Sequence, residues 1–361
     1  MTKVTNSGKQ TFDVAIAGGG FAGRTLALAL AKLAPQGFRV ALVDAEAPGR
    51  GGEDARALAL SAATKNLLSA LGLWQELEPK AQAIESIEIT DSPLDASLRP
   101  HFLGFDAELN RNGASAYLVE YGDLNRALAA AVAQASPVTV FAPDSVTDFT
   151  ADPFRAELNL DSGKPVEASL LVAADGKRSR LREHAGIKCV GWYYPQMGIV
   201  TTVAHERPHH NRAVQHFLPS GPFAILPLKG NRSSIVWTED KAEAERIMTL
   251  DDAAFLSELE KRFGHRLGAI EIAGPRQAFP LDMQIARSFV GERLALIGDA
   301  AHVVHPLAGQ GLNIGMRDVA ALTETIVDAA RLGLDIGTSP QLERYERWRR
   351  FDSDFSAAMM D

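Results

Sequence analysis

The chain has 361 residues, of which 46% are hydrophobic and 23% charged, and its net charge is -8. This composition is typical of a folded α/β protein with a substantial core, either two domains or one large domain with an insertion, and it argues against a disordered or fibrous chain. The acidic balance disfavours a nucleic-acid partner, which needs clustered lysines and arginines, and a single cysteine, Cys189, excludes an intrachain disulfide.

The N-terminal segment predicts a nucleotide-binding unit of strand, helix and strand. Residues 12–17 are an apolar run, three glycines follow, and leucines then recur at helical spacing, which predicts a strand, a tight turn and a helix. A second strand over residues 39–44 completes a unit of about thirty residues, the usual size of a βαβ unit. The first sheet is therefore expected to be parallel.

Gly18, Gly20 and Gly23 have the spacing of a dinucleotide-binding turn. Gly18 permits the tight turn, Gly20 lets a pyrophosphate approach the backbone, and Gly23 lets the helix pack against the strand. The amides at the helix N-terminus then face the phosphates. Asp44, at the end of the second strand, is expected to accept hydrogen bonds from a ribose. An ordinary turn is the alternative, and the motif does not distinguish FAD from NAD.

The rest of the chain alternates between two patterns. Residues 84–90 alternate apolar and polar side chains, which predicts an antiparallel strand outside the first sheet. The apolar runs over 169–174 and 294–297 predict buried strands of the first sheet, and helices are predicted from Asp123 and from Leu312. Short runs separated by Gly, Pro and Asn predict a second, antiparallel sheet; they cover residues 201–205, 213–218, 224–228 and 233–238.

Three segments carry a resemblance to a known family. Residues 171–182 resemble the Asp-Gly motif of FAD-dependent aromatic hydroxylases, the group that includes p-hydroxybenzoate hydroxylase. Residues 293–302 resemble the Gly-Asp motif of that group, and residues 305–318 are similar to the signature of its ubiquinone-biosynthesis branch. The resemblance runs from Phe12 to Phe355, nearly the whole chain.

The resemblance implies an α/β fold like that of p-hydroxybenzoate hydroxylase. It consists of a Rossmann-like FAD-binding domain with a parallel sheet, interleaved with a smaller substrate domain built on an antiparallel sheet. The FAD-binding domain is expected over residues 12–75, 106–186 and 285–335. The substrate domain is expected over residues 76–105 and 187–284, and a C-terminal amphipathic helix over residues 336–361. Because the domains are interleaved, a single cut should not yield two folding units.

The same resemblance implies where FAD binds. Asp299 is expected to hold the ribityl chain, and Gly309–Gly311 to begin a helix whose amides face the flavin and stabilise negative charge on its reduced form. The residues expected to bind the cofactor are Gly18, Gly20, Gly23, Asp44, Arg56, Arg126, Asp175, Gly298, Asp299, Gly309, Gly311 and Asn313. The alternatives are a helix cap for Asp299, a simple turn for Asp175 and an ordinary surface arginine for Arg56.

The chemistry of the family is implied as well. Reduced flavin reacts with molecular oxygen to form a flavin hydroperoxide, which hydroxylates an electron-rich phenol. Pro306, Gly309 and Gln310 are expected beside the reacting ring as the catalytic residues. NAD(P)H or a reductase is expected to deliver electrons transiently, because no second glycine motif accompanies a second βαβ unit.

No metal site is expected from the histidines. His205, His209 and His210 lack the spacing and the accompanying carboxylate that a metal site requires. They are predicted to be polar residues of the surface.

Residues 216–228 predict the surface that binds the substrate, because alternate apolar side chains on a strand can line an apolar slot. The residues predicted to line it are Phe217, Pro219, Phe223, Ile225 and Pro227. A nearly equal alternative places them in the core between two layers. The absence of an evident arginine favours a polyprenylated phenol of ubiquinone biosynthesis over a small carboxylated phenol. A hydroxylase of a small soluble aromatic compound and a non-catalytic FAD-binding subunit of a quinone-biosynthesis complex remain alternatives.

Leu342, Tyr345, Trp348, Phe351 and Phe355 recur at helical spacing near the C-terminus, with arginines between them. This helix is expected to pack on the first domain, and contact with an anionic membrane or a partner protein is the alternative. Members of the family typically continue for a few dozen residues, so the resemblance predicts that, if this end is the natural one, part of the substrate covering or a membrane contact is missing.

The expected location is the cytoplasm. No apolar window is long enough to span a membrane, so any membrane contact is expected to be peripheral, on the inner face of the cytoplasmic membrane. Other quinone-biosynthesis enzymes and the membrane surface are the candidate partners, beside the phenolic substrate.

Overall fold

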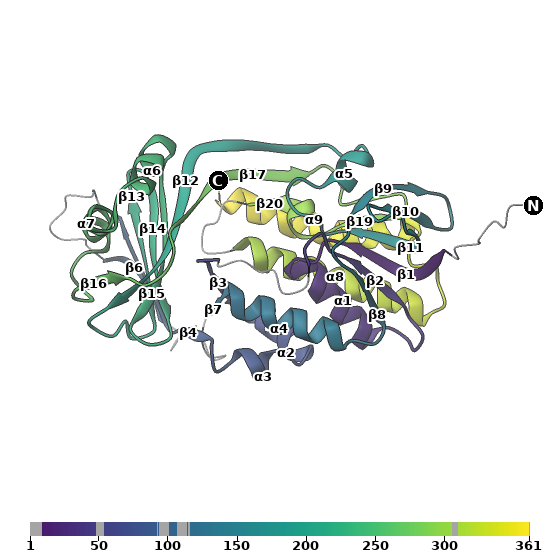
Figure 1. Cartoon of the computed structure of the whole chain (residues 1–361), viewed down its shortest axis with the longest axis horizontal. Coiled ribbons are helices and arrows are strands. Elements are labelled where there is room, and N and C mark those ends of the chain that lie inside the picture. The colour runs from purple at the N-terminus through teal and green to yellow at the C-terminus, as the bar shows by residue number, and fades with distance from the viewer. Residues whose placement is uncertain are drawn as a thin grey trace, which may run out of the picture.

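The computed structural model describes residues 9–47, 54–91, 93, 101–106, 114, 116–304 and 310–360. Two large sheets lie in separate parts of the molecule, and a small third sheet lies near the junction between them (Figure 1). The segments of each part are not contiguous in sequence, because the chain enters the second part twice and returns.

The first sheet is the nucleotide-binding type that the N-terminal pattern predicts. Its main strands run in the order β18 (Val290–Gly291), β19 (Leu294–Leu296), β11 (Pro165–Ala173), β1 (Gln10–Ala17), β2 (Val40–Val43) and β8 (Val138–Phe141), with β10 (Ala156–Leu160) and β9 (Val146–Ala151) added to β11. Strand β1 is parallel to β11 and β2, and β11 is parallel to β19, whereas β10 pairs antiparallel with β11 and β9 antiparallel with β10. The last four residues of β1 are buried, as expected of the near-continuous apolar strands of a parallel sheet.

Three helices pack against this sheet and enclose the main core. They are α1 (Phe21–Leu33), α4 (Tyr121–Gln134) and α8 (Gln310–Arg331), and their apolar stripes share one core cluster with the strands (Figure 1). Smaller helices of the first part are α2 (Ala62–Ala70), α3 (Trp74–Leu77), α5 (Arg180–His184) and the 3-10 turn η2 (Gly298–Ala300). The small sheet consists of β3 (Ala57–Ser61), β7 (Ala116–Glu120) and β4 (Gln82–Ile84).

The second sheet is largely antiparallel. Its strands are β20 (His302–Val303), β17 (Gln277–Ala286), β12 (Cys189–His205), β15 (Arg232–Asp240), β14 (Gly221–Leu228), β13 (Arg212–Leu218), β5 (Ser86–Asp91) and β6 (His101–Asp106), with β16 (Ile270–Ile272) beside β12. The long strands β12 and β17 pair with each other and bridge the two parts of the molecule (Figure 1). One prediction needs correction: β5 is antiparallel to β6 but parallel to β13.

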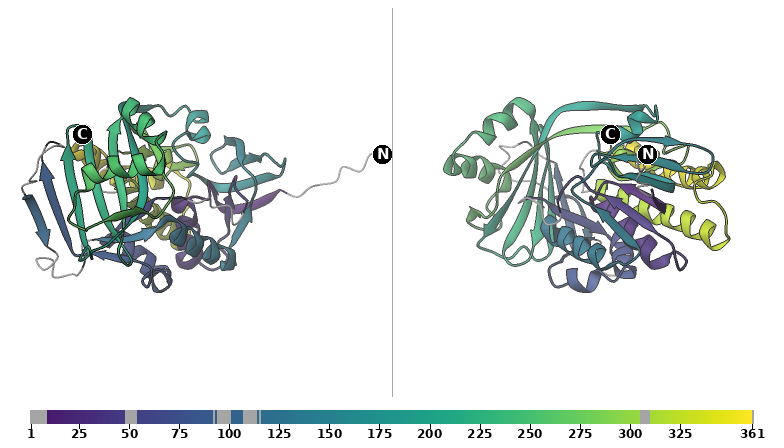
Figure 2. Two further views of the ribbon diagram at one scale, coloured as in Figure 1. Left: turned by 60° about the vertical axis from the view of Figure 1, so that its left-hand side comes forward. Right: turned by 45° about the vertical axis from the view of Figure 1, so that its right-hand side comes forward.

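Among the described residues, two helices cover one face of the second sheet, which we call the outer face. These helices are α6 (Lys241–Met248) and α7 (Asp252–Phe263), and Figure 2 shows them lying across the strands. Phe223, Trp237 and Phe255 are fully buried in the core between these helices and the sheet. The opposite face, which we call the inner face, is directed toward the first part, because Leu226 and Leu228 pack there against β4 and β7.

The C-terminal helix α9 (Ser339–Met360) packs on the first part, as the favoured prediction has it. Leu342 and Tyr345 belong to the main core, and the hydroxyl of Tyr345 donates to the carbonyl of Leu296 at 2.7 Å. Trp348 on the same helix is half exposed. Among the described residues, the longest helices are too polar to cross a membrane.

Candidate cofactor and active site

The glycine turn has the geometry that each glycine was expected to need. Gly18 has a φ of +114°, and a Cβ there would lie 2.1 Å from the carbonyl oxygen of Ala174. A Cβ on Gly23 would lie 1.9 Å from the carbonyl oxygen of Gly18, so this glycine allows helix α1 to approach β1. A Cβ on Gly20 would meet no described heavy atom within 4 Å. The backbone at Gly20 is therefore open to an incoming group.

Helix α1 begins at this open position. Its N-cap residue is Gly20, which has no side chain to accept from the first amides of the helix. These amides carry the positive end of the helix dipole and suit a phosphate. The turn therefore fits a dinucleotide cofactor.

Asp44 lies beside the turn, but it already has a cationic partner that the sequence did not reveal. Its carboxylate accepts from Arg24 at 3.0 Å and from the amide of Glu46 at 3.1 Å. Arg24 also donates to Asn125 on helix α4 at 2.6 Å. The position of Arg24 could have indicated this contact, because it directly follows Gly23 on the first turn of α1, beside the end of β2. The contact of Asp44 with a ribose remains a prediction.

Arg56 lies where the two parts of the molecule meet. It forms a bidentate ion pair with Asp54, and this hydrogen-bonded partner raises the pKa of the guanidinium. The guanidinium lies over the rings of Tyr121, at 5.0 Å, and of Phe279 on β17, at 5.1 Å. It is therefore held by two rings and a carboxylate, which makes it more than an ordinary surface arginine.

Arg126 is well exposed on helix α4. Its guanidinium donates to the carboxylate of Asp123 at 2.6 Å, one turn earlier on the helix. Its role at the adenosine end of the cofactor remains a prediction.

The two Asp/Gly motifs both follow strands of the first sheet. Asp175 follows β11; its Oδ2 accepts from the amide of Leu181 at 3.4 Å, while its Oδ1 is buried and has no hydrogen-bond partner among the described residues. Such an orphaned acceptor is rare in a folded protein and fits a donor from a ligand. Gly298 follows β19 with a φ of +59° and donates its amide to Asp318 at 2.9 Å.

Asp299 is the next residue in this turn. Its side chain is accessible to water but is surrounded by protein atoms on most sides, and the resulting loss of hydration raises the pKa of its carboxyl. The nearby cations Arg56 and Lys177 oppose this rise. A recessed carboxylate that a ligand can still reach is suited to accept hydrogen bonds from hydroxyl groups of a cofactor.

The structure shows the contacts of two predicted cofactor residues on helix α8, Gly311 and Asn313. Gly311 lies in its first turn, where a Cβ would make only an ordinary contact of 3.9 Å with Val304. Asn313 is buried; its amide donates to the carbonyl of Ala59 at 2.8 Å and its oxygen accepts from the amide of Ser61 at 2.9 Å. These bonds link α8 to β3, and the contact of Asn313 with the cofactor remains a prediction.

The predicted catalytic residues can be placed only in part. Pro306 and Gly309 lie outside the described residues, and Gln310 is the first residue of α8. Within the described ranges, no cluster of three or more His, Cys, Asp or Glu side chains could hold a metal ion. His205 is not a surface residue: it is buried, bonds to the carbonyl of Arg207 at 2.7 Å, and burial lowers the pKa of its imidazole.

The predicted substrate residues divide between the two faces of the second sheet. Phe217 on β13 lies on the inner face and is 40% exposed, and Pro219 is exposed in the turn between β13 and β14. Phe223, Ile225 and Pro227 alternate onto the outer face, where Phe223 stands opposite Trp237. For these three the core alternative is correct, because α6 and α7 cover that face.

The apolar side chains that face the first part belong to the alternate residues of the same strands, whose side chains point to the inner face. Val200, Ala224 and Val236 stand opposite one another on β12, β14 and β15. They belong to none of the three core clusters of the described residues. This stretch of the inner face therefore lies outside the packed cores of the described residues, although Val200 and Ala224 are themselves buried and only Val236 is partly exposed.

Comparisons with known proteins agree with this site. A family model described as an FAD binding domain matches residues 11–350. The ubiquinone hydroxylase UbiL of Rhodospirillum rubrum is 43% identical over 99% of this chain and 82% of its own length. The 3-demethoxyubiquinol 3-hydroxylase of Escherichia coli is 34% identical over 98% of this chain and 89% of its own length.

Solved structures show the same fold at low sequence identity. PqsL of Pseudomonas aeruginosa, in complex with 2-aminobenzoylacetate, superposes with a TM-score of 0.83 at 20% identity over 97% of this chain and 95% of that one. The p-nitrophenol 4-monooxygenase PnpA of Pseudomonas putida superposes with a TM-score of 0.78 at 21% identity over 97% and 88%. With the glycine turn, the recessed Asp299 and the extent of these matches, the chain belongs to the family of FAD-dependent monooxygenases that contains the ubiquinone-biosynthesis hydroxylases.

Proposed function

We propose that this chain uses bound FAD to hydroxylate the aromatic ring of a polyprenylated phenol in ubiquinone biosynthesis. The relatives described above carry the names ubiquinone hydroxylase and 3-demethoxyubiquinol 3-hydroxylase. Those names support a ubiquinone-type substrate for this chain as well, because the identity extends over nearly all of it.

The observation that carries the substrate class is the chemistry of the inner face. Val200, Ala224 and Val236 form an apolar surface there, continued by Phe217. On the described inner-face positions of β12 to β15, the only cationic side chain is Arg232, which pairs with Glu120 at 2.8 Å near the junction with β7. A carboxylated phenol needs a cation, whereas a prenylated phenol needs the apolar area that this face offers.

Each part of the site then has a role in the reaction. Bound FAD would take electrons from NAD(P)H or a reductase and pass them to molecular oxygen, which activates the oxygen for hydroxylation. The open backbone at Gly20 and the first amides of α1 hold the phosphates, and Asp299 and Asp175 accept hydrogen bonds from the cofactor. The inner face orients the ring and excludes water from the reacting atoms, which keeps the reaction from being diverted.

The first test is the absorption spectrum of the purified protein. We expect flavin bands that bleach anaerobically with NAD(P)H and return, with a hydroxylated product, when oxygen and a prenylated phenol are added. A colourless protein that takes up no added FAD contradicts the proposal. A yellow protein that consumes no oxygen with any phenol would instead support a non-catalytic FAD-binding subunit.

A charge placed on the inner face tests the substrate class. Val236→Arg is expected to lower turnover of a prenylated phenol at least tenfold while improving the relative rate of a carboxylated one, because the new cation favours an anionic group. Val236→Ala is the matched control and should retain most turnover. A wild-type protein that prefers the carboxylated phenol would refute this part of the proposal.

We also propose that the protein meets the membrane surface peripherally, since a polyprenyl tail partitions into a bilayer. Val190 and Trp192 share one face of β12 and are 48% and 41% exposed, whereas Tyr193 on its other face is 80% exposed. Exposed aromatic side chains of this kind favour the membrane interface. Co-sedimentation with phospholipid vesicles should be weakened by Trp192→Ser combined with Tyr193→Ser. Equal binding of the wild type and the double variant would exclude this surface.

A further inference from the structure

A buried cluster of charged side chains lies directly behind the Gly298 turn. Its centre is Asp318 on α8, which is fully buried. The carboxylate accepts from the amide of Gly298 at 2.9 Å and contacts Nε2 of His302 at 2.6 Å, both through Oδ2. Its other oxygen accepts from Nε of Arg349 on α9 at 2.7 Å. His302 and Arg349 are 2% and 3% exposed.

Such a cluster is costly to bury, and simple stability does not require it. Removing two or three charges from water costs several kcal/mol per ion, and apolar residues of similar volume often serve a core equally well. One partner of the cluster, however, is a backbone amide in the turn that presents Asp299. The carboxylate of Asp318 therefore acts on the position of that turn as well as on the packing of two helices.

Further contacts make the turn depend on α8 and α9. A Cβ on Gly315 of α8 would lie only 3.3 Å from the Cα of Gly298, so the helix packs directly against the turn. From α9, Tyr345 bonds to the carbonyl of Leu296, in the strand that leads into the turn. Glu346 accepts from the hydroxyl of Ser288 at 2.8 Å and thereby holds the segment before that strand. Helix α9 therefore contacts both β19 itself and the segment that precedes the hairpin of β18 and β19.

We propose that Asp318 is a positioning residue of the cofactor site and that Arg349 and His302 hold its carboxylate in place. In this arrangement Arg349 connects the C-terminal helix to the cofactor site through Asp318, and it acts on the position of the Gly298 turn without touching the cofactor. The inference rests on the proposed role of Asp299 in binding FAD. It assigns to Arg349 a role that packing alone does not supply.

The test compares two buried arginines. Arg349→Met removes the charge from the cluster, and Arg262→Met removes an equally buried arginine that pairs with Glu239 at 3.0 Å in the second sheet. For both variants we would measure the dissociation constant for FAD, by titrating the apoprotein, and the free energy of unfolding. We expect both to be destabilised, and only Arg349→Met to raise the dissociation constant, by tenfold or more. Arg262→Met should stay within twofold of the wild type.

Two further measurements keep the test sharp. Asp318→Asn should speed amide hydrogen exchange in the peptide that contains Gly298. Arg349→Lys keeps the positive charge but loses the Nε donor, so it should recover only part of the FAD affinity that Arg349→Met loses. If Arg349→Met fails to fold, Arg349→Lys carries the test, with an intermediate rise in the dissociation constant expected.

The outcomes separate this inference from the proposed function. A wild-type protein that binds no FAD overturns both. FAD binding by the wild type with equal affinity in Arg349→Met overturns the positioning role alone. Equal losses in Arg349→Met and Arg262→Met also overturn it, because they would show a general effect of stability.

Discussion

At the scale of single residues, Gly20 and Gly23 belong to one motif but have different surroundings. The space beside Gly20 is open, whereas a Cβ on Gly23 would collide with the backbone of Gly18. The φ of Gly20 is −70°, a value that alanine adopts without strain. Gly20 is therefore needed for the approach of the ligand, whereas Gly23 is needed for the packing of α1 against the turn.

This difference predicts opposite phenotypes. Gly20→Ala should fold with an unfolding free energy close to that of the wild type and bind FAD at least tenfold more weakly, because the methyl group occupies the approach of the phosphates. Gly23→Ala should unfold more easily, by about 2 kcal/mol or more, as expected for overpacking. Chemical denaturation of the apoproteins and FAD titration check both. Undiminished FAD affinity in Gly20→Ala would move the phosphates away from this turn.

A second residue-scale prediction concerns pH. Arg293 is almost completely buried and forms a bidentate ion pair with Asp335, whose side chain is 39% exposed. The hydrogen bonds from Arg293 lower the pKa of Asp335 below its ordinary value of 3.8. Because this folded-state pKa is depressed, the stabilisation is present above the ordinary pKa and is lost as the pH falls through the lowered value.

Asp335→Asn should therefore destabilise the protein near neutral pH, by about 2 kcal/mol, less than for a fully buried pair because water reaches the carboxylate. The difference from the wild type should stay constant from about pH 7 to pH 5 and shrink below about pH 4. Urea denaturation of both proteins across this range tests it. A difference that grows on acidification would contradict the assigned sign.

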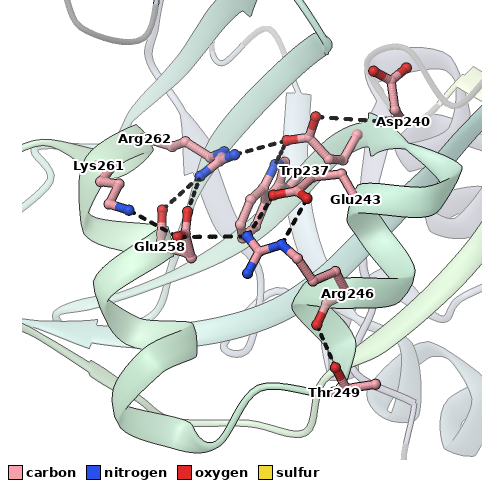
Figure 3. Close-up of polar contacts among 9 residues, drawn as sticks. Trp237, Asp240, Glu243, Arg246, Thr249, Glu258, Lys261 and Arg262 are labelled. Atoms are coloured by element: carbon pink, nitrogen blue, oxygen red, sulfur yellow. Dashed lines mark hydrogen bonds and ion pairs between the residues drawn. The ribbon is translucent and has the colours of Figure 1, made fainter.

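At the scale of elements, the pairing of α7 with the second sheet depends on a polar network inside an apolar core. Figure 3 shows Arg262 of α7 directed toward Glu258, beside Trp237. Its guanidinium also donates to Glu239 at 3.0 Å. The guanidinium lies 4.2 Å from the centroid of the Trp237 ring, and the indole donates to Glu239 at 3.1 Å. Arg262 thus satisfies a carboxylate that would otherwise be buried beside the aromatic core.

Arg262→Met should lower the free energy of unfolding by about 3 kcal/mol, because it leaves the charge of Glu239 buried with no cation, and with only the indole of Trp237 and the amide of Asp240 as donors. The double variant Arg262→Met with Glu239→Gln should recover part of that loss. Urea denaturation followed by tryptophan fluorescence measures both. A single variant as stable as the wild type would mean that water reaches Glu239.

The sequence of β14 does not show which of its side chains face the first part of the molecule. Both faces of β14 carry apolar residues, with Phe223 and Ile225 on one and Ala224 and Leu226 on the other. Alternation alone could not determine which set faces the first part, because parity depends on where the helices pack. Helices α6 and α7 follow β15 and cover the side of Phe223, so the smaller side chains of Ala224 and Val236 are left for the inner face.

At the scale of the whole molecule, the two parts share the chain several times. Strand β19 and helix α8 come from the last quarter of the sequence, yet they pair with β11 and cover β1 in the first sheet. Strands β12 and β17 connect the parts, and the amide of Ala55 bonds to Gln277 of β17 at 3.0 Å across the junction. The exact domain boundaries remain a prediction.

Interleaving of this kind predicts the behaviour of fragments. A fragment of residues 9–186 lacks β19 and α8, so one edge of β11 and the apolar faces of α1 and β1 would be exposed to water. We expect it to be insoluble or to lack a cooperative unfolding transition. Adding residues 285–360 as a separate chain should restore both properties. A fragment 9–186 that unfolds cooperatively alone would refute the interleaved description.

Sequence by itself determined the features that depend on neighbours along the chain. The glycine turn, the apolar strands of the first sheet, the long helix α8 and the helical spacing of the C-terminus all follow from local periodicity and from the backbone limits of glycine. Only the tertiary structure decided the partners of Asp44, the face of β14 that looks inward, and the meeting of His302, Asp318 and Arg349. These depend on contacts between segments far apart in the sequence, whose geometry local patterns do not encode.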